Sequence, residues 1–115
     1  MIEEYSCKVE YDSEFDLLAL RRLGMHATSG IAAGPFTIAL DKHGLVGIEI
    51  EDTKDVLESL FGFKLSLDKI TKGKIGFKEE KNMMLIYFSL NYENKELKKE
   101  VVVPKITAMP IMTKA

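Results

Sequence analysis

The residues of this chain with the clearest potential for chemistry stand in one short segment. Arg21 and Arg22 are the only arginines among its 16 basic residues, and a loop of small residues with three glycines, residues 24–34, follows them directly. An arginine guanidinium binds phosphate or carboxylate through a planar fork of N–H donors. Glycines let backbone N–H groups approach an anion closely, and hydroxyl or imidazole side chains can add hydrogen bonds. The segment predicts a small-ligand or phosphate-binding site whose candidate residues are Arg21, Arg22, His26, Thr28 and Ser29.

A plainer interpretation of the same segment is a loop that joins two strands. One arginine would then be solvated, and the other would pair with an acid such as Glu49. The segment matches neither the phosphate-binding P-loop nor the dinucleotide-binding fingerprint. Both interpretations stay open on the sequence alone.

Other reaction chemistry finds little support. Ser29 and His26 are three residues apart, but the loop contains no G-x-S-x-G elbow. The two histidines, His26 and His43, belong to no metal-ligand spacing, and Cys7 is the single cysteine. A lone cysteine in a strand is typical of a small buried hydrophobic residue. We therefore expect no metal, no cofactor and no disulfide, and enzymatic activity is not favoured.

The composition limits the class of protein. A chain of 115 residues with 46% hydrophobic residues corresponds to one domain, residues 1–115. The net charge of −2 does not favour nucleic-acid binding or an anionic membrane. No apolar run reaches the ~18 residues of a membrane span, and the acidic N-terminus lacks a signal-peptide pattern, so a cytoplasmic location is expected. The excess of lysine and glutamate is a thermophile tendency.

The first half predicts two β-hairpins and a helix. Residues 5–11 and 16–23 form the first hairpin, with a helix as the competing interpretation of residues 15–23. The second hairpin has Val46, Ile48 and Ile50 on one face of its return strand and Gly47, Glu49 and Glu51 on the other, after a turn that ends at Gly44. A helix over about residues 52–61 follows, begun by Asp52 or Thr53, lined by an apolar stripe and ended by Gly62 at the C′ position.

The second half predicts strands at residues 74–77, 83–90 and 100–103. The three valines of the last strand suggest burial on both faces or shielding by charged neighbours. Residues 63–72 fit either a short strand or a helical turn from Ser66. The tail, residues 106–112, contains a proline and is at best an edge strand.

The predicted fold class is α+β, mainly β, with an antiparallel meander and one short helix. It is divided into a β-unit with the helix (9–61) and a second β-unit (73–112). Residues 8–20 align without gaps to residues 74–86, which indicates two similar hairpin units, whether by duplication or by coincidence. One short helix cannot cover both faces of a sheet, so either the two β-units pack face to face or a partner covers the remainder.

The first half also resembles a known family. The segments Y-D-S-E-F-D-L-L-A-L-R (11–21) and D-K-H-G-L-V-G-I-E-I (41–50), followed by the helix, are similar to a small prokaryotic domain of unknown function. That family shows a Y-D-x-x-x-D-x-L hairpin and a D-x-x-G-x-V-G-I-E-I strand, and the resemblance covers about residues 9–60. It implies an antiparallel sheet with one helix, no known activity or cofactor, and for some members an antitoxin-like partner role.

Two surface features complete the sequence picture. A basic stretch, Lys69 to Lys81, is typical of a solvated edge strand, because lysines there discourage aggregation. Four methionines in the second half (Met83, Met84, Met109 and Met112) suggest a soft apolar surface, which predicts a homodimer or a protein partner. The sequence thus favours a non-enzymatic interaction or regulatory module, with a small-ligand or phosphate-binding protein as the alternative.

Overall fold

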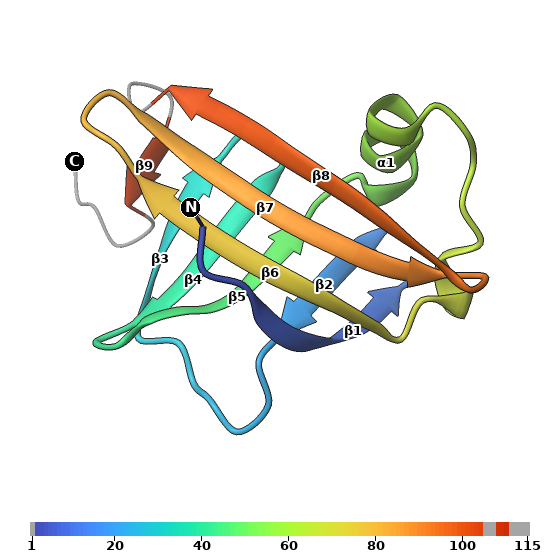
Figure 1. Cartoon of the computed structure of the whole chain (residues 1–115), viewed down its shortest axis with the longest axis horizontal. Helices are drawn as coiled ribbons and strands as arrows, with labels where there is room; N and C mark the ends of the chain where they lie inside the picture. The colour runs from blue at the N-terminus through green and yellow to red at the C-terminus, as the bar shows by residue number, and fades with distance from the viewer. Residues whose placement is uncertain (1, 105–107, 111–115) are drawn as a thin grey trace.

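One antiparallel sheet dominates the computed structural model, which describes residues 2–104 and 108–110 (Figure 1). The described strands are β1 (Tyr5–Asp12), β2 (Leu17–Arg21), β3 (Ser29–Ala33), β4 (Phe36–Asp41), β5 (Gly44–Ile50), β6 (Lys72–Glu79), β7 (Met83–Tyr92), β8 (Lys95–Pro104) and β9 (Ala108–Pro110). A helix, α1 (Thr53–Phe61), and a 3-10 turn, η1 (Leu67–Lys69), lie between β5 and β6. The predicted fold class, α+β and mainly β with one short helix, is confirmed.

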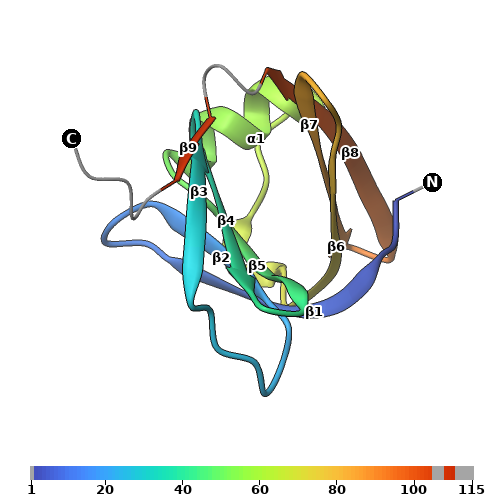
Figure 2. The ribbon, with the colours of Figure 1, turned by 90° about the vertical axis from the view of Figure 1, so that its left-hand side faces the viewer.

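The strand order is β8-β7-β6-β1-β2-β5-β4-β3-β9. The pairs β1–β2, β3–β4, β4–β5, β6–β7 and β7–β8 are hairpins. The pairings of β1 with β6 and of β2 with β5, between distant segments, join these hairpins into one sheet, and β9 adds to its edge beside β3. The sheet curls into a trough, in which β3 and β4 stand opposite β6, β7 and β8 while β1 forms the floor (Figure 2). α1 lies at the open side of the trough, between the two walls (Figure 2).

The concave face of this trough holds the core. Alternate residues of each strand point inward, so that Leu20, Ile48 and Ile38 follow one another across β2, β5 and β4 and are fully buried. The walls meet at Phe88 of β7, whose ring centroid lies 6.2 Å from that of Phe36 on β4 and 6.2 Å from that of Phe61 on α1. The two walls of the trough therefore pack face to face within one continuous sheet.

The helix has the predicted apolar stripe and the predicted C-terminal glycine. Leu57 is buried, and Val56, Leu60 and Phe61 pack against the core. Gly62 adopts φ 84° and its N–H donates to the carbonyl of Glu58.

The predicted N-terminal cap of the helix is wrong, because neither Asp52 nor Thr53 caps it with its side chain. The Thr53 hydroxyl donates to the carbonyls of Asp16 and Ile50, at 2.9 and 2.8 Å. The carboxylate of Asp16, in the β1–β2 turn, accepts from the Lys54 N–H at 3.2 Å.

Two further expectations about elements need correction, and one open alternative is decided. The predicted loop 24–34 contains a strand, β3, whose small residues pair with β4 and, in the backbone, with β9. β8 begins at Lys95 rather than near residue 100, it forms an edge of the described sheet, and Val102 is 56% exposed rather than buried on both faces. Of the two interpretations of residues 63–72, the helical turn from Ser66 is confirmed, because η1 follows Ser66 and no strand is formed there before β6.

The C-terminal tail lies mostly outside the described residues. β9 is an edge strand, as the proline predicts. In the described part, no helix is long and apolar enough to cross a lipid bilayer.

Candidate functional site

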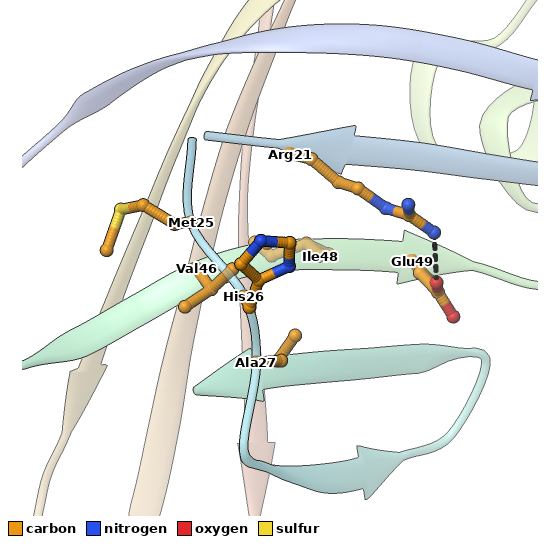
Figure 3. A pocket seen from close by; sticks show the side chains of 9 residues that line it. Arg21, Met25, His26, Ala27, Val46, Ile48 and Glu49 are labelled. Carbon is orange, nitrogen blue, oxygen red and sulfur yellow. Dashed lines mark hydrogen bonds and ion pairs between the residues drawn. The ribbon is translucent and has the colours of Figure 1, made fainter. Parts of the chain in front are cut away.

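A pocket of about 210 Å³ lies on the outer face of the sheet, where the segment between β2 and β3 crosses over β5 (Figure 3). Its walls combine one cation, one carboxylate and one imidazole with an otherwise apolar lining. The lining residues are Arg21, Met25, His26, Ala27, Ala39, Val46, Gly47, Ile48 and Glu49. We call this hollow the Arg21 pocket.

Arg21 is placed by strand register. It ends β2 and stands directly opposite Gly47 of β5, while its neighbour Leu20 points into the core. A β-carbon at position 47 would lie 2.8 Å from the Leu20 carbonyl oxygen and 3.4 Å from the Arg21 Cγ. Only glycine therefore fits against the backbone of β2 at this position.

From there the guanidinium reaches along β5 to Glu49. Arg21 Nη2 donates to Glu49 Oε2 at 3.3 Å (Figure 3). The Arg21 side chain is 61% exposed and that of Glu49 is 33% exposed, and an exposed pair of this kind contributes only about 0–1 kcal/mol to folding. Within the described residues this is the only side-chain hydrogen bond of Arg21, so the other guanidinium N–H groups face the pocket and solvent.

Two backbone features shape the crossing segment and the pocket floor. The β4–β5 register shifts between Ala39 and Leu40, so Val46 is an extra residue on β5 with no counterpart on β4. Such a bulge bends a strand and redirects its side chains. The Val46 carbonyl accepts from the Arg22 N–H at 2.9 Å, and Thr28 N–H donates to the Leu40 carbonyl at 2.8 Å, which ties both ends of the segment that carries His26.

The five residues predicted for a ligand site separate in space. Arg21 and His26 line the Arg21 pocket. Arg22 lies on the other face, where its Nη1 donates to the Leu45 carbonyl at 2.8 Å and its guanidinium carbon sits 3.9 Å from the centre of the Tyr5 ring. Thr28 and Ser29 are exposed, Ser29 begins β3, and neither lines the pocket.

Seven of the nine lining residues were not among the predicted site residues, and the most informative of these are Gly47 and Glu49. Gly47 and Glu49 belong to the V-G-I-E-I segment, for which a purely architectural role was the obvious interpretation. The available signal was the alternation along β5, which already placed Gly47 and Glu49 on the face opposite Ile48. The sequence also named Glu49 as a partner for one arginine, and the structure shows that pair.

The chemistry available in the pocket is recognition by charge and hydrogen bonds. None of its nine lining residues is a serine, threonine, cysteine or lysine, so His26 and Glu49 are the side chains of the lining with nucleophilic atoms. Within residues 2–104, no group of three or more histidine, cysteine, aspartate or glutamate side chains gathers where it could hold a metal ion. His43 lies instead in the β4–β5 turn, where its N–H donates to the Asp41 carboxylate at 2.7 Å.

The chain matches no protein-family model, and neither the curated proteins nor the solved structures contain a significant match. The resemblance to the prokaryotic domain of unknown function stays a prediction.

Proposed function

We propose that the protein binds a small anionic molecule in the Arg21 pocket. The observation that carries this proposal is the convergence of Arg21 and His26, from two different segments, on one hollow with an apolar floor. Such hollows, with a few polar groups over apolar walls, are the usual form of small-molecule sites.

The composition of the pocket points to a carboxylate or phosphate group on a small apolar body. The free N–H groups of Arg21 suit the two oxygens of either anion, and Met25, Ala27 and Val46 supply apolar contact. Glu49 repels a bare anion but accepts a hydrogen bond, so a hydroxyl or amino group beside the anion completes the match. A volume of about 210 Å³ admits a molecule of metabolite size rather than a macromolecule.

Titration with phenyl phosphate, followed by amide NMR spectra and calorimetry, tests the proposal. We expect saturable shifts confined to residues 21–27 and 46–49. Arg21→Ala should weaken binding about tenfold or more, because hydrogen bonds to a charged group contribute about 1.5–3 kcal/mol. His26→Ala should weaken it less, and His43→Ala, the matched control in the β4–β5 turn, should leave it unchanged. Absence of shifts at millimolar ligand, or an equal effect of His43→Ala, would contradict the proposal.

A protein-interaction role is the second candidate, and the free edge of β8 favours it. Among the described strands β8 pairs only with β7, along all ten of its residues. Val102 and Met83, which are 56% and 41% exposed, give this edge an apolar end. Pairing of β8 with a second copy would add a neighbour along its outer edge, over residues 95–103, and bring these side chains into an interface.

Light scattering across a range of concentrations tests this second candidate. A homodimer is expected for the natural sequence, and Val102→Lys should shift it to a monomer. Leu23→Lys, which changes a similarly exposed leucine outside β8, should not. A monomeric mass at high micromolar concentration would exclude the homodimer.

A further inference from the structure

Three basic side chains stand in one row across the outer face of the sheet. Lys8 of β1 is directly opposite Arg21 of β2 on one side and directly opposite Lys72 of β6 on the other. All three residues are exposed. Side chains directly opposite on neighbouring strands leave the backbone about 4.5–5.5 Å apart. We call Lys72, Lys8 and Arg21 the cation row.

The ordinary explanation for surface lysines does not apply to this row. Lysines protect the exposed edges of sheets, and the sequence predicted that role for the basic stretch that includes Lys72. β6, β1 and β2 instead occupy the third, fourth and fifth places of nine. Like charges directly opposite one another destabilise a sheet. Within the described residues, Arg21 pairs with Glu49, while Lys8 and Lys72 form no ion pair.

Hollows flank the row. The Arg21 pocket begins at one end, and a groove of about 430 Å³ accompanies the other two cations. The groove is lined by two lysines, two hydroxyl-bearing residues, a cysteine and a leucine: Ser6, Cys7, Lys8, Leu23, Thr71 and Lys72. Lys74 stands opposite Ser6, one row further along the same face. A ligand that occupies the Arg21 pocket can therefore extend over the row.

We propose that the cation row binds a chain of two or three phosphate groups carried by the ligand of the Arg21 pocket. This inference rests on the proposed function, because Arg21 belongs to both sites. Each added phosphate brings negative charge to a place where unpaired cations repel one another, so binding removes that repulsion. The row spans only three strands and the whole chain carries a net charge of −2, which favours a small oligophosphate over a nucleic acid.

Calorimetry with inorganic orthophosphate, pyrophosphate and tripolyphosphate tests the row separately from the pocket. We expect affinity to rise with each phosphate, and Lys8→Gln and Lys72→Gln each to weaken tripolyphosphate binding about tenfold, the loss of one charge-assisted contact. Lys54→Gln, an exposed lysine on α1, is the matched control and should change nothing. Both row variants should still bind phenyl phosphate as the natural protein does.

The thermal midpoint separates a binding role from a structural one. Because Lys8→Gln removes two repulsive neighbours, its midpoint should be equal to or above that of the natural protein, so lost binding cannot come from misfolding. Equal affinities for orthophosphate and tripolyphosphate, or an equal effect of Lys54→Gln, would overturn the inference while leaving the phenyl phosphate site intact. Tighter binding of a single-stranded oligonucleotide than of tripolyphosphate would overturn it in favour of nucleic acid. Failure of the natural protein to bind phenyl phosphate, with tripolyphosphate still bound through Lys8 and Lys72, would overturn the proposed function and, with it, the link between the cation row and a ligand of the Arg21 pocket.

Discussion

At the scale of single residues, Gly47 links the fold to the candidate site. Its lack of a side chain lets β5 lie close to the backbone of β2 at the point where Arg21 begins, and the Arg21 guanidinium reaches Glu49 from there. Sequence alone could identify Arg21 as chemically unusual and could name Glu49 as its partner. It could not reveal that Gly47 faces Arg21, because that depends on the register of two strands whose paired residues lie 26 to 32 positions apart in the chain.

Gly47→Ala tests this link. The added β-carbon meets the Leu20 carbonyl oxygen at 2.8 Å, so we expect a loss of about 1–3 kcal/mol of unfolding free energy from overpacking. The same change should weaken phenyl phosphate binding, because Arg21 must move. Urea denaturation and the NMR titration measure the two effects. Unchanged binding in a folded Gly47→Ala protein would show that Arg21 does not need this glycine.

Cys7 provides a second prediction at this scale. Burial raises the pKa of its thiol from an ordinary 9.0 to about 12, and the side chain is only 7% exposed. The thiolate is the reactive form, so the native protein should react with a thiol reagent at pH 8 far more slowly than the urea-unfolded chain. The raised pKa also means that the unfolded thiol ionises first as pH rises above 9, so stability should fall there. Labelling of native and unfolded protein at equal rates would contradict the assigned burial.

At the scale of elements, the β1–β2 turn and α1 depend on each other. Asp16 adopts φ 51°, accepts from the Tyr11 hydroxyl at 2.7 Å and accepts from the Lys54 N–H at the start of the helix. The sequence predicted the helix and its C-terminal glycine from local signals. It assigned the N-terminal cap to the adjacent residues, because a cap supplied from 38 positions away leaves no local pattern.

A pair of glycine substitutions isolates this cap. Asp16 and Asp52 both have positive φ, so glycine removes the same backbone cost at each position. Asp16→Gly also removes the carboxylate that accepts hydrogen bonds from the Tyr11 hydroxyl and the Lys54 N–H. The Asp52 side chain, by contrast, makes no capping hydrogen bond. Asp16→Gly should therefore be less stable than Asp52→Gly by about 1–2 kcal/mol, as measured by urea denaturation. Equal stability of the two variants would mean that the Asp16 carboxylate does not stabilise the N-terminus of α1.

At the scale of the whole molecule, two pairings decide the shape. The β1–β2 and β4–β5 hairpins can be read from the sequence, because alternation and turn residues are local. The pairing of β1 with β6 and of β2 with β5 cannot, because many strand orders bury the same apolar faces. The strand β3 escaped prediction for a related reason: its small residues carry no polarity pattern, and only its neighbours make it a strand. The candidate site lies where these distant strands meet, so its residues were predicted only in part.

Phe88 is the residue at which this arrangement can be tested. It is fully buried and contacts Phe36 on the opposite wall and Phe61 on the helix. Phe88→Ala should cost about 3–5 kcal/mol, a large share of the roughly 5–15 kcal/mol of a typical domain. Phe15→Ala, which truncates a phenylalanine that is 72% exposed, should cost little.

The manner of unfolding distinguishes one core from two. If Phe88 joins both walls and the helix, signals from the sheet and from α1 should be lost in one transition, at a midpoint well below that of the natural protein. Far-ultraviolet circular dichroism and NMR intensities of residues in β4 and β7 would follow it during heating. Two separate transitions in Phe88→Ala, with β4 and β7 lost at different temperatures, would mean that each β-unit holds a core of its own. A single shared transition would instead show that the two halves of the chain unfold cooperatively, because neither wall can bury its inner face without the other.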